Sequence, residues 1–410
     1  MKDKIKVAVI GVGGRGHGMI GTIDCMDDVE IIGVCDVYQD RVEAAQKRVF
    51  EEKGWTPFGT TDYNEIFELE GLDSVYIASD WSTHIKIAIA AMKKGIPAAM
   101  EVGGAYSLNE CWELVDTYEK TGTWAMMMEN CCYGEREMMV HNMVRQGLFG
   151  KIVFCAGQYA HDLRGEVGFG TKNRHYRLRN YLSRNCENYP THELGPIAKI
   201  LEINRGNRMT SMVSYCTGSY GMKDYVNKTP ELQEELSGRD FAQADIVKTI
   251  IKTERGEMIE LTLDTTLPRY YSRGFTVRGT DALYQEDGDT LFCDNDSELR
   301  KFEWNQGGLW GNAAKFAEEY NSDLWKKKNE DVLNAGHGGM DWYVLRAWVE
   351  TVKTDALPPI DVYDAASWMC ITPLSEISLK NGGQVMEIPD FTRGKYKDRE
   401  PLADNAYAIK

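Results

Sequence analysis

Two patterns of apolar and polar positions divide the chain. In the first 130 residues, short continuous apolar runs rich in β-branched residues alternate with helical stretches that end at a glycine. Continuous apolar strands separated by helices predict a parallel sheet covered on both faces. The predicted strands are 6–12, 29–37, 73–79, 97–102 and 123–130, and two of the predicted helices are 40–54 and 83–95.

From about residue 150, apolar and polar residues alternate instead. Alternation predicts antiparallel strands with one covered face, and the turn at 254–256 joins two of them as a hairpin. The segment 162–190 lacks an apolar period, and a loop of that length in a compact domain is usually functional. The predicted strands are 151–161, 245–253, 257–266 and 274–279, and the predicted helices are 191–203, 338–353 and 362–380.

These patterns predict an α/β protein of two domains. The first, 1–130, is expected to hold a doubly wound parallel sheet of the Rossmann type. The second, 131–410, is expected to be an α+β domain with an open, largely antiparallel sheet, and its C-terminal helices are expected to pack back towards the first domain.

A glycine fingerprint for dinucleotide binding follows the first predicted strand. Gly11, Gly13 and Gly16 fit G-x-G-x-x-G between a strand and a helix, and Asp36 ends the next strand 20 residues after Gly16. The glycines let the backbone approach a pyrophosphate at the helix N-terminus. A carboxylate at Asp36 accepts from ribose hydroxyls and repels a 2′-phosphate, so the sequence predicts NAD rather than NADP.

Residues at the ends of the first-domain strands are further candidates for cofactor binding, because ligands of open α/β sheets bind outside the carboxyl ends of the strands. Trp81 and His84 are candidates to line the nicotinamide ribose, and His84 has the alternative of packing locally at a helix start. Arg15 either contacts a phosphate or is a solvated surface residue. The complete predicted cofactor set is Gly11, Gly13, Gly14, Arg15, Gly16, Asp36, Ser79, Trp81, His84, Glu101 and Asn130.

Tyrosines and histidines of the second predicted domain are the candidates for chemistry. Tyr159 and His161 lie two apart on a predicted strand, so their side chains point the same way. Thr191 is a suitable N-cap, which places His192 in the first helical turn, where the macrodipole favours a neutral imidazole that can act as a base. Taken singly, His161 is better explained as a half-buried strand residue and His192 as a hydrogen-bonded helix-start residue. Only their clustering favours catalysis.

Two more polar residues have open interpretations. His337, within GHGGMDW, is interpreted as structural, with the alternative that it bounds the site. Arg177 either holds a sugar hydroxyl or a carboxylate, or anchors its irregular loop. No metal site is expected, because His192-Glu193-Leu194 is not H-E-x-x-H and no C-x-x-C occurs.

The composition of the chain limits the kinds of binding partner that can be expected. A net charge of −16 argues against nucleic acid and anionic membrane surfaces. The sequence shows neither the apolar core of a signal peptide nor a run of 18 apolar residues, so a cytoplasmic location is expected.

The order of the longer motifs resembles a known family. The fold pattern resembles the glucose–fructose oxidoreductase and inositol dehydrogenase superfamily (Gfo/Idh/MocA), and the motifs resemble glycoside hydrolase family 109, the NAD-dependent α-N-acetylgalactosaminidases. The motifs are MMMENCCYGEREMMVHNMVRQGLFGKIV (126–153), GQYAHDLR (157–164), YRLRN (176–180), NYPTHELGPIAKILEINRGNR (188–208), EEYNSDLWKK (318–327) and GHGGMDW (336–342).

This resemblance implies hydrolysis of a carbohydrate with no net redox change. Bound NAD⁺ takes a hydride from C3, a base removes the acidified C2 hydrogen, the C1 substituent is eliminated, water adds at C1, and NADH returns the hydride. The resemblance also implies a homodimer or homotetramer that associates through the open face of the second sheet.

The family's active-site positions, carried onto this sequence, give the residues their expected roles. Tyr159 is the candidate base at C2, provided that a nearby cation lowers its pKa. His192 is the candidate acceptor of the O3 proton, and His161 and Tyr189 assist the leaving group or orient the sugar. The implied substrate-binding residues are Glu129, Arg177 and Tyr320.

Two positions depart from the related sequences. Glu101-Val102-Gly103 stands where many superfamily dehydrogenases carry Glu-Lys-Pro with a catalytic lysine, which favours the glycosidase. Glu193 stands where the family is expected to have glycine, and a carboxylate near the sugar would alter which amide or hydroxyl is accepted. The alternatives are an NAD-dependent sugar or inositol dehydrogenase and a non-catalytic NAD-bound sensor. The intact tyrosine–histidine set disfavours the sensor.

Overall fold

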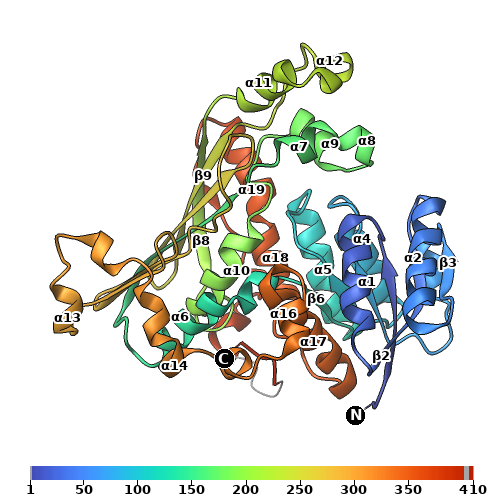
Figure 1. Cartoon of the computed structure of the whole chain (residues 1–410), viewed down its shortest axis with the longest axis horizontal. Coiled ribbons are helices and arrows are strands. Elements are labelled where there is room, and N and C mark those ends of the chain that lie inside the picture. The colour runs from blue at the N-terminus through green and yellow to red at the C-terminus, as the bar shows by residue number, and fades with distance from the viewer. Residues whose placement is uncertain (1, 401–405, 410) are drawn as a thin grey trace. The chain divides into compact units, whose positions relative to one another are not determined.

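The computed structural model describes residues 2–400 and 406–409, which form two compact units (Figure 1). The first unit consists of the residues up to Glu135, Asp323–Ala366 and the described residues from Glu400 onwards. The second consists of Arg136–Ser322 and Ser367–Arg399. The units interleave along the sequence, and a linear domain boundary between residues 130 and 131 stays a prediction.

The sheet of the first unit has six parallel strands in the order β3-β2-β1-β4-β5-β6. The predicted doubly wound parallel sheet is therefore confirmed, and the strand order reverses between β1 and β4, where such sheets bind ligands. β3 was missed because three residues are too few to show a period. The strands are β1 (Ile5–Ile10), β2 (Val29–Cys35), β3 (Phe58–Thr60), β4 (Ser74–Ile77), β5 (Ala98–Met100) and β6 (Ala125–Met127).

Helices of the first unit pack in pairs, α1 on α2 and α4 on α5. Because crossovers between parallel strands are right-handed, the reversal of strand order puts the two pairs on opposite faces of the sheet. Helix α17 comes from late in the sequence and packs against α1 and β1. The helices are α1 (Gly14–Asp24), α2 (Gln39–Lys53), α3 (Tyr63–Ile66), α4 (His84–Lys93), α5 (Leu108–Thr121), η1 (Asn130–Tyr133), α15 (Asp323–Lys326), α16 (Glu330–Asn334), η4 (His337–Gly339) and α17 (Met340–Thr354).

The sheet of the second unit has eight strands in the order β13-β12-β11-β7-β10-β9-β8-β14. Its pairs are antiparallel except for β7 with β10, so the predicted largely antiparallel sheet is confirmed. β8, β12, β13 and β14 were not predicted. The strands are β7 (Ile152–Ala160), β8 (Met209–Cys216), β9 (Ile246–Thr253), β10 (Met258–Asp264), β11 (Thr276–Gly279), β12 (Ala282–Gln285), β13 (Thr290–Cys293) and β14 (Met386–Glu387).

Helices cover one face of this second sheet, with α10 against β7 and α19 against β8. The helices of this part of the chain are α6 (Glu135–Arg145), α7 (Arg164–Gly168), α8 (Gly170–Asn173), α9 (Arg177–Ser183), α10 (Thr191–Ile200), α11 (Gly221–Lys228), α12 (Pro230–Leu236), α13 (Ser297–Arg300), η2 (Gln306–Leu309), η3 (Asn312–Phe316), α14 (Ala317–Tyr320), α18 (Val362–Met369), α19 (Ile371–Lys380) and η5 (Lys395–Lys397).

Three local predictions need correction. The segment 162–190 is not fully irregular but holds the short helices α7, α8 and α9. The predicted helix 362–380 is two helices interrupted at Cys370, and the apolar pattern runs through that interruption. Thr191 is not an N-cap, because Pro190 occupies the cap position with a φ of −70° that already fits a helix, so α10 begins at Thr191.

None of the helices in residues 2–400 and 406–409 combines the length and the apolar composition needed to cross a bilayer.

Candidate functional site

The glycine fingerprint forms a tight cradle between β1 and α1. Gly11 has a φ of +87°, and a Cβ there would lie 2.5 Å from the backbone N of Ser79. A Cβ at Gly16 would lie 1.9 Å from the carbonyl O of Gly11, whereas one at Gly14 would meet nothing within 4 Å. The backbone is therefore closely packed beneath the helix N-terminus and open above Gly14. Free space over backbone N–H groups at a helix N-terminus fits the pyrophosphate of NAD.

The carboxylate of Asp36 is fixed beside this cradle by the backbone. Its Oδ2 accepts a hydrogen bond of 3.0 Å from Val12 N, and its Oδ1 accepts one of 3.1 Å from Tyr38 N. Nη1 of Arg41 lies 3.9 Å from Oδ2. The structure thus places Asp36 where the fingerprint requires an acceptor for ribose hydroxyls.

Arg15 is partly exposed and is held by two carboxylates, and its contact with a phosphate stays a prediction. Its Nε donates to Glu101 Oε1 at 2.7 Å, and its Nη1 and Nη2 donate to the carboxylate of Asp341 at 2.8 and 3.0 Å. Asp341 also accepts from Asn130 Nδ2 at 2.7 Å and lies 2.8 Å from His337 Nδ1. Although burial opposes ionisation, these contacts with His337 and Arg15 hold the pKa of Asp341 well below its ordinary value.

Sequence reasoning missed Asp341, although the residue lies within the GHGGMDW motif. Its carboxylate joins the fingerprint helix, the segment that follows β6, and the start of α17, and Arg15 extends this network to Glu101 after β5. The contact between His337 Nδ1 and the carboxylate of Asp341 agrees with the interpretation of His337 as a structural residue.

The predicted residues at the end of β4 pack against one another. His84 is buried, and its Nε2 lies 2.5 Å from Ser79 O, so the structure favours local packing for this side chain. Burial lowers the pKa of His84. Trp81 is also buried, and a Cβ at Gly103, whose φ is +145°, would lie 2.5 Å from its indole Cδ1. Contact of these residues with NAD stays a prediction.

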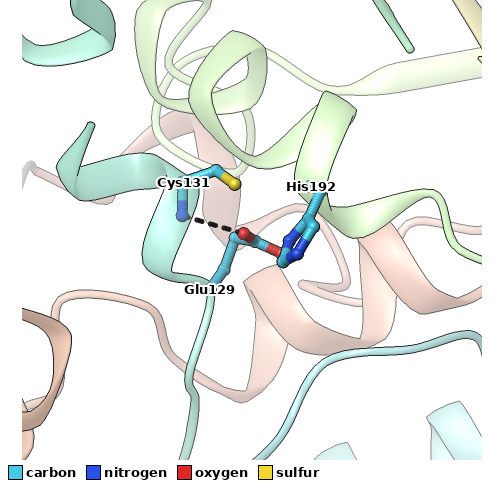
Figure 2. Close-up of side chains that lie close together, drawn as sticks. All are labelled: Glu129, Cys131 and His192. Carbon is cyan, nitrogen blue, oxygen red and sulfur yellow. Dashed lines mark hydrogen bonds between the residues drawn. The ribbon is translucent and has the colours of Figure 1, made fainter. Parts of the chain in front are cut away.

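Glu129 follows β6 and is fully buried. Figure 2 shows its carboxylate accepting a hydrogen bond from the backbone N–H of Cys131, with a length of 3.0 Å. This bond caps the short helix η1. The predicted role of Glu129 in substrate binding stays a prediction.

Four predicted residues of the second unit form an aromatic group, defined here as Tyr159, His161, Tyr189 and His192. The rings of Tyr159 and Tyr189 lie 4.3 Å apart between centroids at an angle of 34°. The ring of His192, which projects from the first turn of α10 (Figure 2), meets them edge-on at 5.7 and 4.9 Å. His161 lies 6.3 Å from Tyr159 at the end of β7. The structure therefore brings together the residues that were predicted to perform proton transfer.

Arg177 is the cation expected near Tyr159. It begins α9 and is buried, and its guanidinium carbon lies 5.8 Å from the ring centre of Tyr159 and 5.1 Å from that of Tyr189. Its Nε lies 2.6 Å from Glu166 Oε1. Burial nevertheless raises the pKa of Tyr159 to about 12, because desolvation outweighs the lowering influence of Arg177. Arg177 is thus the expected cation that lowers the pKa of Tyr159, but its influence is smaller than that of burial.

Glu193 lies one residue beyond His192, and its carboxyl points into the sheet. The side chain is buried, and its Oε2 accepts a hydrogen bond of 3.0 Å from Thr262 N on β10. The backbone of the sheet thus binds one oxygen of this carboxyl group, and an influence of Glu193 on sugar specificity stays a prediction. A Cβ at Gly157 would lie 2.9 Å from the Cβ and the carbonyl O of Glu193, so α10 rests directly on β7.

Tyr320 is not brought to the aromatic group by any contact among the described residues. Its ring packs on Phe316 at 6.5 Å, and its carbonyl O accepts from Asn142 Nδ2. The preceding helix η3 packs on β13, which lies three positions from β7 in the sheet. The predicted role of Tyr320 stays a prediction.

Tyr271 lies beside the aromatic group and was missed by sequence reasoning. Its ring meets His161 edge-on at 5.4 Å and is 45% exposed. The neighbouring Ser272 exchanges both backbone hydrogen bonds with Ala160, which fixes Tyr271 at the end of β7. No local pattern indicates a pairing across more than a hundred residues.

Comparison with known proteins supplies the family. Residues 5–129 match the oxidoreductase family with an NAD-binding Rossmann fold, and residues 133–398 match the C-terminal domain of glycosyl hydrolase 109. A glycosyl hydrolase family 109 protein of Stenotrophomonas maltophilia is 37% identical and covers 97% of this chain and 91% of its own length. An alpha-N-acetylgalactosaminidase of Tannerella forsythia is 34% identical, with 97% and 88% covered.

Solved structures share the fold at low identity. An inositol dehydrogenase homolog from Azotobacter vinelandii, complexed with NAD⁺, has a TM-score of 0.66 at 15% identity and covers 94% of this chain and 97% of its own. A levoglucosan dehydrogenase in complex with NADH and L-sorbose has a TM-score of 0.69 at 14% identity, with 95% and 100% covered. The first unit contains an NAD-binding Rossmann domain, and the chain belongs to glycosyl hydrolase family 109.

Proposed function

We propose that this protein is an NAD-dependent glycosidase that hydrolyses an α-N-acetylgalactosaminide or a related glycoside without net oxidation. The main support is the aromatic group, in which Tyr159, Tyr189 and His192 are buried, with the guanidinium of Arg177 over the ring of Tyr159. The first unit of the same chain has a cradle for NAD. Relatives named alpha-N-acetylgalactosaminidase, in Tannerella forsythia and in Shewanella oneidensis, supply the substrate class.

When bound in the cradle, NAD⁺ supplies reversible oxidation at C3 of the sugar, which acidifies the C2 hydrogen. The chain's own residues then have two protons to move, from O3 and from C2. His192, at the start of α10, is assigned to the O3 proton, because an imidazole can accept a proton and its ring lies beside that of Tyr159, at 5.7 Å between centroids.

Tyr159 is assigned to the C2 proton, which only its phenolate can accept, so the phenol must first lose its own proton. The positive charge of Arg177 stabilises that phenolate, whereas burial of the ring raises the free energy needed to form it. His161 and Tyr189 flank Tyr159 and are assigned to the leaving group and to orientation of the sugar. Glu129, Arg177 and Tyr320 remain the proposed substrate-binding residues.

A panel of α- and β-nitrophenyl glycosides tests this proposal. The purified protein is expected to release nitrophenol from the α-N-acetylgalactosaminide or a close relative, with many turnovers per NAD⁺. The second candidate is a sugar or inositol dehydrogenase, which the solved neighbours favour. Formation of one NADH per keto-sugar, with the glycosidic bond intact, would establish the dehydrogenase and overturn the glycosidase.

We also propose a homodimer or homotetramer that associates through the open face of the second sheet. Phe154, Met258, Ile250 and Val213 lie on the face opposite α10, because they alternate with the residues that face that helix and are joined by strand register. Tyr215 on the same face is 61% exposed. Light scattering is expected to give a dimer or tetramer that Met258→Glu dissociates, and a monomeric wild-type protein would contradict the proposal.

We further propose that the protein is located in the cytoplasm. Its support is that Cys25 and Cys216 are exposed free thiols, as is usual in a reducing compartment. Cell fractionation with an antibody is the test, and recovery of the protein outside the cytoplasm would refute it.

A further inference from the structure

Two buried carboxyl groups lie behind the aromatic group, in the same unit. Glu187 is 0% and Glu193 is 2% exposed, and each carboxyl group influences the ionisation of the other. Both carboxyl oxygens of Glu187 and Oε1 of Glu193 are buried and accept no hydrogen bond from the described residues. Among the described residues, no arginine or lysine forms an ion pair with either of them. Burial, and for Glu193 also the neighbouring carboxyl, raises the pKa of both groups, that of Glu187 to about 8.

Each carboxyl group lies near the backbone of a candidate catalytic residue. Glu193 accepts from Thr262 N at 3.0 Å, and the backbone N–H of Tyr159 faces the same carboxyl group. Glu187 faces the backbone N–H of Tyr189. Glu193 also directly follows His192 in the chain. The pair therefore connects three members of the aromatic group through their main chain.

The surroundings of the pair contain no free countercharge among the described residues. Glu187 N donates to Ser375 Oγ of α19 at 2.8 Å. Arg184 is bound to Glu376 of α19 at 2.9 Å, and burial raises the pKa of Cys186 to about 12, so that thiol is neutral. The titratable and charged side chains on the neighbouring elements are Cys155 and Tyr159 on β7, Arg177, Arg179 and Tyr181 on α9, Arg184, Cys186 and Tyr189 before α10, His192 and Lys199 on α10, Glu260 and Asp264 on β10, and Glu376 and Lys380 on α19.

We propose that Glu187 and Glu193 share one proton and act as a positioning pair for Tyr159, Tyr189 and His192, an inference that rests on the proposed glycosidase reaction. With one proton, the two groups form a single O–H···O⁻ hydrogen bond. With none, they are two like charges in a low-dielectric interior and repel each other. Loss of the shared proton would then loosen α10 and the Tyr189 segment from β7 and β10, and would disturb the aromatic group.

Stability against pH tests the shared proton independently of activity. A glutamate has a pKa of about 4.3 in the unfolded chain, so the folded protein binds more protons than the unfolded chain between about pH 4.3 and about pH 8. The free energy of unfolding is therefore expected to fall as pH rises through this window. Glu187→Gln should make this fall in the free energy of unfolding less steep, and Glu234→Gln, on the exposed side of α12, should leave the fall unchanged.

Infrared spectra of the holoenzyme should show a protonated carboxyl band that Glu187→Gln removes.

Kinetics of Glu193→Gln test the positioning role. An amide can accept from Thr262 N and donate to Glu187 without a titratable proton. We expect this variant to keep kcat within a few-fold of wild type at about pH 7, and the ratio of its kcat to that of wild type to rise towards about pH 9. Glu193→Ala lacks both bonds and is expected to lose about 10²-fold in kcat with a smaller change in KM.

Identical pH profiles for wild type and Glu193→Gln would overturn the positioning role. A protonated carboxyl band and a stability slope that persist in Glu187→Gln would overturn the shared proton. If the wild-type protein cleaves no glycoside, the proposed function fails, and the infrared and unfolding measurements still decide whether the pair shares a proton.

Discussion

Tyr159 is held between two opposing electrostatic influences. Arg177 over its ring favours the phenolate, and burial favours the phenol. Burial has the larger effect, which places the pKa near 12. Arg177 also shares its charge with Glu166, so less of it acts on the phenol. The site therefore holds a protonated tyrosine before substrate binds.

Substitution of the proton-transfer residues gives the first prediction. Tyr159→Phe and His192→Ala are each expected to lower kcat by about 10²–10⁴-fold, the usual contribution of an acid–base group. Tyr215→Phe, on an exposed tyrosine of β8, serves as the control and should keep full activity. Thermal unfolding accompanies the assay. Near-wild-type kcat in either variant would remove that residue from the mechanism, and a loss explained by melting would make its role structural.

Asp36 gives a prediction on cofactor choice. Asp36→Ala removes the acceptor for ribose hydroxyls and leaves Arg41 beside the vacated position. We expect the preference for NAD over NADP to fall by tenfold or more, since like-charge juxtaposition costs about several kcal/mol. Fluorescence titration with both nucleotides measures the ratio. An unchanged ratio would show that Asp36 does not face the ribose.

Sequence reasoning found the residues that carry a local signal and missed those that depend on distant pairing. Asp36 and Gly16 follow from spacing, and Tyr159 and His192 from a strand and a helix start. Tyr271 reaches His161 only because Ser272 pairs with Ala160. The high pKa of Tyr159 depends on complete burial, which no neighbour in the sequence reveals.

At the scale of elements, close backbone contacts determine where the site residues stand. α1 approaches β1 at Gly16, and α10 approaches β7 at Gly157. Both approaches are too close for a side chain. The long apolar runs and the hairpin at 254–256 were predictable, whereas β3 and the helices α7 to α9 are too short to show a period. The two helices at 362–380 share one continuous apolar pattern, so the sequence does not reveal the interruption at Cys370.

Gly16 of the fingerprint and the nearby Gly14 give a matched test of the cradle. A Cβ at Gly16 would lie 1.9 Å from Gly11 O, so Gly16→Ala must displace the loop, and overpacking of this kind costs about 1–3 kcal/mol. Gly14→Ala meets nothing within 4 Å of its Cβ. Calorimetry is expected to show loss of NAD binding in Gly16→Ala and a smaller change in Gly14→Ala. Equal affinities in the two variants would argue against the cradle.

At the scale of the whole molecule, the sequence pattern identified two sheets of different kinds but not how the chain is shared between the units. Residues 323–366 return to the first unit, and β7 pairs in parallel with β10 across about a hundred residues. Both features are long-range, and local periodicity carries no information about them. The family resemblance supplied the mechanism, which the fold alone does not, because dehydrogenases share it.

Retention of the cofactor is expected for a protein that recycles NAD within each turnover. Denaturation of the purified protein should release close to one NAD per chain, measured by enzymatic assay of the supernatant. Recovery of NADP instead would contradict the position of Asp36 beside the cradle.

Hydrogen exchange at C2 of the sugar tests the central claim most directly. The reaction is run in D₂O with a glycoside that the protein cleaves and catalytic NAD⁺, and the product is read by NMR. Oxidation at C3 followed by deprotonation predicts deuterium at C2 of the released sugar, with no accumulation of NADH and with both reactions lost in Tyr159→Phe. Cleavage that leaves C2 free of deuterium, or a keto-sugar formed one for one with NADH while the glycosidic bond stays intact, would contradict the account.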